Sequence, residues 1–196
     1  MTVRIEIATG DSIAAHVDAL AVLRIAVFRD YPYLYAGSLD YERRYLASYA
    51  GSPASTVVLA LDGDRVVGAS TALPLALHSD EVVPPLVNAG YAADRVYYYG
   101  ESVLEPAYRG HGVGSQFFDA RERRARDLGY STATFCAVER PASHPRRPPD
   151  YAPPGALWRR HGFARRPDIV GEFSWRDLDD ADETAKPMVF WIKELA

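Results

Sequence analysis

The sequence has one cysteine, two lysines and no long hydrophobic run, and each scarcity excludes a class of structure or chemistry. The single cysteine, Cys136, excludes an internal disulfide framework and a cysteine-based zinc site, and it fits a reducing compartment. No segment approaches the ~20 apolar residues of a membrane helix, and residues 1–6 lack the apolar core of a signal peptide. We therefore expect a cytoplasmic protein with no membrane partner.

Charge and size narrow the class further. The net charge of −4 provides no overall attraction to nucleic acid, so no nucleic-acid partner is expected. The five histidines are scattered, with no pair at metal-ligand spacing on one helix, and we predict no metal. A length of 196 residues with 48% hydrophobic content predicts a single domain over 1–196.

The hydrophobic pattern predicts an α+β fold with a mixed sheet. Alternating or β-branched runs predict strands over 3–7, 56–61, 65–73, 96–104, 131–138, 169–175 and 188–192. Three- and four-residue apolar spacing predicts helices over 13–28, 39–49 and 113–128, with short helices within 76–94 and over 156–161. Prolines make 139–155 a long loop. Hairpins followed by a strand–loop–helix–strand unit and a terminal strand pair are typical of α+β proteins.

A glycine-rich loop joins the strand 96–104 to the helix 113–128. It reads Arg109-Gly110-His111-Gly112-Val113-Gly114. Free backbone N–H groups and the positive end of a helix dipole favour an anion, and glycines let a ligand approach the backbone closely. The loop therefore predicts a phosphate site.

The spacing within this loop tests which phosphate it fits. Gly114 is followed by Ser115 and Gln116 and not by a lysine, which argues against a Walker nucleotide-binding loop. A dinucleotide fingerprint requires a third glycine where Ser115 stands, so an NAD-dependent enzyme is weakened as an alternative but not eliminated.

Two motifs together resemble the GNAT-type N-acetyltransferases. The first extends from Val103-Leu104-Glu105-Pro106 through the glycine loop, and the second is Trp158-Arg159-Arg160-His161-Gly162-Phe163. The order of predicted elements is similar to that family from Val3 to Ile192. The resemblance implies a mostly antiparallel mixed sheet flanked by helices, and an N-acetyltransferase that moves an acetyl group to a primary amine of a small molecule or protein by direct attack.

The resemblance also implies acetyl-CoA as co-substrate and assigns its site. The pyrophosphate would lie on the amides of Arg109, Gly110, His111, Gly112, Val113 and Gly114, and the pantetheine beside Val103 and Leu104, with an N–H near Leu104 for the oxyanion. Glu101 is the candidate base; the alternative is a strand carboxylate paired with an arginine. Trp158 stands where many members have a tyrosine acid, and an indole is no acid at this pH. Either Tyr151 or His144 replaces it, or the thiolate leaves unprotonated.

Several side chains have two open interpretations. The 3′-phosphate of coenzyme A could be bound by arginines of the helix and of the proline-rich loop, or the helix set could form a solvated face. The helix set is Arg121, Arg123, Arg124 and Arg126, and the loop set is Arg140, Arg146 and Arg147. Tyr31, Tyr33 and Tyr35, with Tyr97, Tyr98 and Tyr99, shape an acceptor pocket or fill the core. Cys136 lines the thioester pocket or is a small buried residue. A non-catalytic acyl-CoA-binding regulatory module is the alternative function, and a homodimer is left open.

Overall fold

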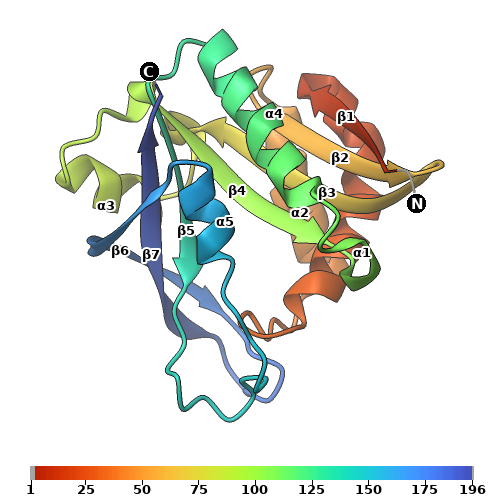
Figure 1. Cartoon of the computed structure of the whole chain (residues 1–196), viewed down its shortest axis with the longest axis vertical. Coiled ribbons are helices and arrows are strands. Elements are labelled where there is room, and N and C mark those ends of the chain that lie inside the picture. Colours follow the sequence, from red (N-terminus) through yellow and green to blue (C-terminus); the bar gives the residue numbers. More distant parts are fainter. Residues whose placement is uncertain (1–2, 196) are drawn as a thin grey trace.

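The structure, a computed structural model, describes residues 3–195 and is built around a seven-stranded sheet with helices on both faces (Figure 1). The strands are β1 (Arg4–Thr9), β2 (Thr56–Asp62), β3 (Arg65–Pro74), β4 (Val96–Leu104), β5 (Thr132–Val138), β6 (Ala164–Trp175) and β7 (Thr184–Glu194). The helices are α1 (Val17–Phe28), α2 (Leu39–Ala50), α3 (Val83–Asn88), α4 (Val113–Asp127) and α5 (Gly155–Arg160). The strand order is β1-β2-β3-β4-β5-β7-β6, and every neighbouring pair except β4–β5 is antiparallel. The predicted mixed, mostly antiparallel sheet is confirmed.

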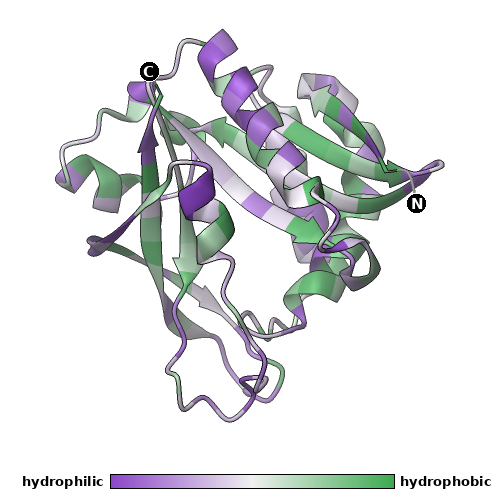
Figure 2. Cartoon of the chain, in the orientation of Figure 1, coloured by the Kyte–Doolittle hydropathy of each residue, from purple (hydrophilic) through white to green (hydrophobic). Residues whose placement is uncertain are grey.

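The two faces of the sheet are covered by different helices. α1 and α2 pack on one face, and α4 packs on the other (Figure 1). Because both faces are covered, β2 is buried from Thr56 to Leu61 and reads as a continuous apolar run instead of an alternating one (Figure 2). An aromatic cluster that includes Tyr99, Phe118 and Phe135 fills the space under α4 and α5.

Strands β4 and β5 run side by side over a short stretch only. Their parallel pairing joins Val96 to Thr132, Tyr97 to Ala133 and Tyr98 to Thr134. Beyond these positions β4 continues to Leu104 against β3, while β5 continues to Val138 against β7. The sheet therefore opens into a wedge between β4 and β5 (Figure 1).

The structure differs from the predicted element bounds in three places. Residues Gly10–His16 form the 3₁₀ helix η1, so the first α-helix begins at Val17. β6 begins at Ala164 and β7 at Thr184, earlier than predicted. Pro167 and Pro187 obscure these strand starts in the sequence, and the pairing of β6 with β7 is irregular between Arg166 and Val170, around Pro167. Within residues 3–195, no helix combines the length and apolar character needed to cross a membrane.

Candidate active site

The glycine-rich loop leads from β4 into α4. Gly110 and Gly112 have φ angles of +81° and +82°, in the left-handed region that favours glycine. Gly112 is the N-cap of α4, with no side-chain cap. Open space lies beside both glycines where a Cβ atom would stand. A ligand therefore has direct access to this part of the backbone.

The amides of the loop are available to an anion. The N–H of Arg109 donates to the carbonyl oxygen of Pro106 at 3.1 Å. No described residue accepts a hydrogen bond from the N–H groups of the following five residues, 110–114. These groups lie at the N-terminus of α4, where the helix dipole is positive. The loop fits a pyrophosphate. Val113 is buried under it and anchors the start of the helix.

The backbone of β4 is unpaired along the wedge. The N–H of Glu105 donates to the carbonyl oxygen of Val67 at 3.0 Å, so Gly68 and Leu104 form a non-hydrogen-bonded pair. The N–H of Leu104 is thus directed away from β3, and the alternation of the strand gives Ser102 the same direction. β5 does not pair with this part of β4. The structure therefore leaves two N–H groups facing the wedge, and Ser102 is one that sequence reasoning missed.

A β-bulge in β4 sets the direction of Glu101. The register passes from Ala72–Tyr99 to Ser70–Ser102, so β4 holds one residue more than β3 here. A Cβ atom on Gly100 would meet the Thr71 side chain and would lie 2.8 Å from the Tyr49 hydroxyl. Only glycine fits that position. The bulge brings both Tyr98 and Glu101 to the wall of one cavity.

Glu101 belongs to a buried charge cluster. Arg24 of α1 pairs with Glu101 through Nη1 at 2.5 Å and with Glu42 of α2 through Nε at 2.5 Å. The Tyr45 hydroxyl donates to Oε2 of Glu101 at 3.2 Å. Burial would lower the pKa of Arg24, but Glu101, Tyr45 and Glu42 outweigh it and raise that pKa well above its ordinary value. Arg24 thus stays charged in the core, and the arginine pairing that the sequence left open is present.

The cavity beside Glu101 has a volume of about 920 Å³, is partly open to solvent, and is lined by α1, α2, β4, β5, the β6–β7 pair and the segments 33–38 and 73–81. Its predicted members are Tyr33, Tyr35, Tyr98, Glu101 and Cys136. Sequence reasoning missed Arg24 and His78, because neither stands in a motif.

His78 follows β3 and lines this cavity. Its ring packs edge-on against Tyr98, with the ring centres 4.5 Å apart. Burial lowers the pKa of His78 to about 4, against a smaller opposite effect of Glu101. The imidazole is therefore neutral at physiological pH.

The two candidate replacements for a tyrosine acid do not line the cavity. The rings of Tyr151 and His144 contact Tyr31, with ring centres 4.7 Å and 5.6 Å apart. Neither belongs to the cavity wall. Trp158 of α5 packs against Phe135, with ring centres 5.1 Å apart, and is half-buried in the aromatic cluster. The residue at the usual tyrosine position therefore has a packing contact and no acidic proton.

Cys136 is buried, and its Sγ lies 3.1 Å from the Tyr98 hydroxyl. Burial raises the pKa of the thiol to about 12, so it stays protonated. The other tyrosines of β4, Tyr97 and Tyr99, belong to the aromatic cluster on the α4 side. Of the three adjacent tyrosines, Tyr98 alone lines the cavity.

Two interpretations of the α4 arginines were open, a solvated face and contact with the 3′-phosphate of coenzyme A. Both are wrong for Arg121. It is 1% exposed, and its guanidinium lies over the rings of Tyr99 and Phe118 at 4.5 Å and 4.9 Å. Burial lowers the pKa of Arg121 to about 10. The aliphatic carbons of Arg121 are buried, and its charged guanidinium makes cation–π contacts with the two rings. Its spacing from Phe117 and Ala125 places Arg121 on the buried face of α4, but the ring of Tyr99 that it covers comes from β4.

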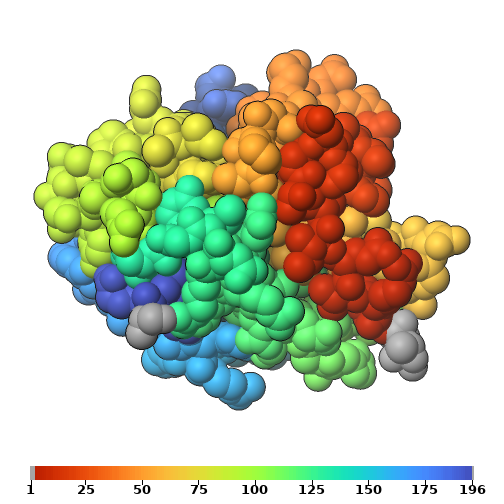
Figure 3. All heavy atoms as spheres, turned by 90° about the horizontal axis from the view of Figure 1, so that it is seen from above, coloured from red at the N-terminus to blue at the C-terminus, as the bar shows by residue number. Residues whose placement is uncertain are grey.

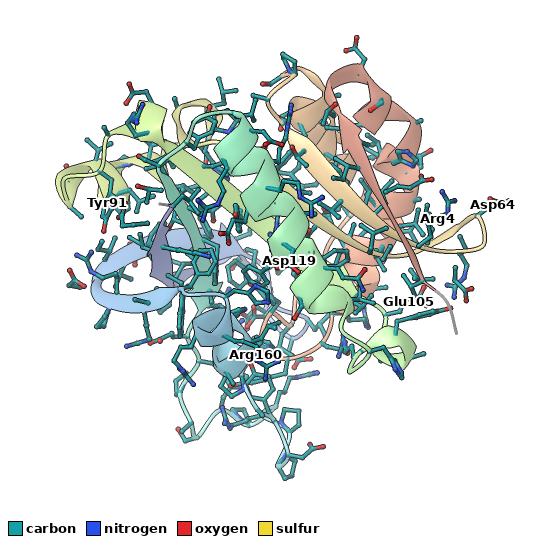
Figure 4. All side chains as sticks on the ribbon, turned by 45° about the horizontal axis from the view of Figure 1, so that its top comes forward. Arg4, Asp64, Tyr91, Glu105, Asp119 and Arg160 are labelled. Carbon is teal, nitrogen blue, oxygen red and sulfur yellow. The ribbon has the colours of Figure 1, made fainter. Side chains whose placement is uncertain are left out.

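Arg123 and Arg126 are exposed, whereas Arg124 is half-buried and donates to the carbonyl oxygen of Pro53 at 3.0 Å. Arg123 and Arg126 border a groove of about 570 Å³ between α4 and α5. Figure 4 labels Asp119 and Arg160, which come from these two helices and border the same groove. Seen from above, the later part of α4 lies between the segment 76–94 and the red segment of β1 and η1 (Figure 3).

The three loop arginines have protein partners. Arg140 donates to the carbonyl oxygens of Pro32 and Tyr33 at 2.9 Å and 3.0 Å and pairs with Asp177. Arg146 pairs with Asp179, and the guanidinium of Arg147 lies over the ring of Tyr151. Arg140 therefore has a structural role between two loops. No cluster of three or more potential metal ligands occurs among the described residues.

Comparisons with solved structures agree on the fold. An N-acetyltransferase from Staphylococcus aureus Mu50 has 14% identity and a TM-score of 0.63, with all of both chains covered. A ribosomal-protein-alanine N-acetyltransferase from Brucella melitensis has 16% identity and a TM-score of 0.62, covering 98% of this chain and 99% of that one. An aminoglycoside 6′-N-acetyltransferase complexed with coenzyme A has 15% identity and a TM-score of 0.59, with 97% of each chain covered.

The sequence comparisons identify the family. No curated protein matches the chain. A model of the acetyltransferase (GNAT) family matches residues 20–147, more than half of the sequence and the part that holds the glycine loop, β4 and Glu101. The chain therefore belongs to the acetyltransferase (GNAT) family.

Proposed function

We propose that the protein transfers the acetyl group of acetyl-CoA to a primary amine of a small molecule or a protein. The observation that carries the proposal is the continuity of three features along β4 and its loop. Free amides at 110–114 lead to the N–H groups of Leu104 and Ser102 at the wedge, and these lead to Glu101 at the cavity. The neighbour complexed with coenzyme A has the same fold, which supports the same class of ligand.

In this proposal the loop 109–114 holds the pyrophosphate, and the pantetheine lies beside Val103 and Leu104. The polar backbone groups of Val103 pair with β3, so Leu104 supplies the hydrogen bonds toward the ligand. Bound acetyl-CoA supplies a thioester with an electrophilic carbonyl carbon. In this arrangement acetyl-CoA passes through the wedge between β4 and β5, so that its phosphates lie at the N-terminus of α4 and its carbonyl carbon lies at the cavity.

The reaction needs a base and a donor. The amine attacks the carbonyl carbon, a C–N bond forms and the C–S bond breaks. Glu101 accepts the amine proton, directly or through a water molecule. The N–H of Leu104 donates to the carbonyl oxygen as negative charge develops there. Because Trp158 has no acidic proton, coenzyme A leaves as the thiolate.

A specific observation favours a second candidate, a non-catalytic acyl-CoA-binding regulatory module. Trp158 lacks the acid, and Arg24 holds the carboxylate that would act as base. Such a module would bind acetyl-CoA and turn over no amine.

The experiment that tests the proposal compares two glycine substitutions. Gly112 and Gly63 both have left-handed backbone with open space at the Cβ position, and Gly63 lies in the β2–β3 turn, outside residues 109–114. Gly112→Asp and Gly63→Asp should therefore cost similar stability, whereas only Gly112→Asp places a negative charge on the phosphate loop. We expect acetyl-CoA affinity, measured by calorimetry, to fall at least about tenfold in Gly112→Asp alone.

Coenzyme A release with a panel of primary amines completes the test. Turnover of any amine together with the glycine result supports the enzyme. Binding without turnover favours the regulatory module. Stabilisation by NAD and not by acetyl-CoA would overturn both.

A further inference from the structure

Hydrogen bonds around His78 fix which ring nitrogen carries the proton. The backbone N–H of Ser79 lies 2.8 Å from Nδ1 of His78 and can only donate. The Ser79 hydroxyl donates to Oε2 of Glu81 at 2.7 Å, and its oxygen lies 3.2 Å from Nδ1, a longer contact than that of the backbone N–H. Nδ1 is therefore an acceptor and holds no proton. The neutral ring carries its proton on Nε2.

The Nε2–H of His78 is available to a ligand. His78 lines the cavity beside Glu101, and among the described residues no group pairs with Nε2. Nε2 is also not one of the buried polar atoms that lack a partner. An accessible N–H on the cavity wall can donate to an oxygen of a bound molecule. It cannot accept a proton from an amine, because the lone pair of this imidazole is on Nδ1.

The other residues of the cavity wall indicate which chemical group the rest of the bound molecule carries. Nine of the 26 lining residues are Phe, Tyr or Trp, among them Phe28, Tyr33, Phe173 and Trp175. Tyr33 packs on both Phe28 and Trp175, with ring centres 4.5 Å and 5.9 Å apart. Such a surface favours a flat or apolar group.

We propose that His78 recognises the acceptor, and that the acceptor is a primary amine with an aromatic body and a carboxylate or carboxamide oxygen that the Nε2–H binds. This inference rests on the proposed function of the same site. The amine lies toward Glu101, the oxygen toward His78 and the aromatic group against the tyrosine and tryptophan rings. His78 is then a specificity residue and takes no part in the transfer of the acetyl group.

The test compares phenylalaninamide with phenethylamine, which lacks the carboxamide, and every kcat/KM is expressed per unprotonated amine because the carboxamide also lowers the pKa of the amine. We expect wild-type kcat/KM to favour phenylalaninamide at least about tenfold, mainly through KM, since one side of a buried hydrogen bond would otherwise be unpaired. Glycinamide, which lacks the aromatic body, should be the poorest of the three. In His78→Phe the ratio of phenylalaninamide to phenethylamine should fall to about one. In His78→Gln, whose amide N–H reaches a similar place, it should be intermediate.

His16→Phe is the matched control, because His16 ends η1 and is not part of the cavity wall. Its ratio should equal that of the wild type, and thermal unfolding checks that every variant is folded. Equal kcat/KM for the two amines in the wild type, or an unchanged ratio in His78→Phe, would overturn the proposal. If no amine is turned over, the proposed transfer fails by itself, and calorimetric binding of the two amines in the presence of coenzyme A still decides the role of His78.

Discussion

Arg24 holds two carboxylates inside the core, one from α2 and one from β4. Its guanidinium also lies over the ring of Tyr45 at 4.5 Å. The pairing with Arg24 fixes the direction of the Glu101 carboxylate, which suits a group that must receive a proton at a defined place. Arg24 therefore links the proposed base to α1 and α2, the two helices that also line the cavity proposed for the acceptor amine.

Glu101→Gln tests the proposed base. It keeps the size of the side chain and removes the charge that accepts the proton. We expect kcat to fall about 10²–10⁴-fold while acetyl-CoA affinity is retained. Glu105→Gln is the control, because Glu105 pairs with Arg65 outside the cavity. Unchanged turnover in Glu101→Gln would remove this residue from the mechanism.

Glu42→Gln tests the support behind the base. Glu42 is fully buried, and its loss leaves Arg24 with one charged partner. We expect the free energy of unfolding in urea to fall by about 3 kcal/mol, the low end for a broken buried pair. The exposed pair of Arg43 with Asp18 offers the comparison, and Arg43→Met should leave the free energy of unfolding near the wild-type value. Equal effects of the two variants would contradict the assigned role of Arg24.

At the scale of the elements, the wedge between β4 and β5 leaves part of a central strand without a neighbour. Hydrogen exchange measured by NMR should show the N–H of Leu104 and Ser102 exchanging faster than that of Val103, which pairs with β3. Saturating acetyl-CoA should slow Leu104 in particular. Equal exchange of these amides with and without acetyl-CoA would count against the proposed pantetheine path.

The β6–β7 turn is tied to the α1–α2 loop. Asp177 pairs with Arg140 and lies 3.3 Å from Lys186, and the N–H of Leu178 donates to the carbonyl oxygen of Leu34 at 2.8 Å. Burial opposes ionisation of Asp177, but the hydrogen bonds and charges of Arg140 and Lys186 outweigh it and lower its pKa.

A lowered carboxyl pKa contributes stability above the unfolded-state pKa of about 4, and this stability is lost as pH falls through the folded-state value. The difference in unfolding free energy between wild type and Asp177→Asn should therefore be largest above pH ~5 and shrink at lower pH. Urea titrations at a series of pH values measure it. A difference that is constant with pH would show that the charge of Asp177 does not act.

The sequence predicted the elements better than it predicted the contacts between them. The glycine loop and the strand before it are local features, so their spacing and turn chemistry could be interpreted directly. The bulge at Gly100, the pairing of Arg24 with Glu101 and the place of His78 depend on residues far apart in the chain. Arg121 was misjudged although its spacing from Phe117 and Ala125 places it on the buried face of α4, because the Tyr99 ring that accommodates its charge comes from a distant strand.

At the scale of the whole molecule, one sheet runs from β1 to β6, and the single domain over 1–196 remains a prediction. It requires one cooperative unfolding transition. Far-ultraviolet circular dichroism and tryptophan fluorescence should give the same urea midpoint, since Trp158, Trp175 and Trp191 all lie in the second half of the chain. Acetyl-CoA should shift both midpoints together. Separate midpoints would show two independently folding parts.

The tie between the α1–α2 loop and the β6–β7 turn also bears on how acceptor range can change. The cavity wall joins segments more than a hundred residues apart in the chain. Gly100 and Glu101 line the same cavity from β4, and the phosphate loop lies outside it. An insertion or deletion of one or two residues in the α1–α2 loop or the β6–β7 turn would break the contacts between them. The cavity would then accommodate longer amines. Acceptor range can therefore drift through surface insertions and deletions, with the residues proposed for acetyl transfer left unaltered.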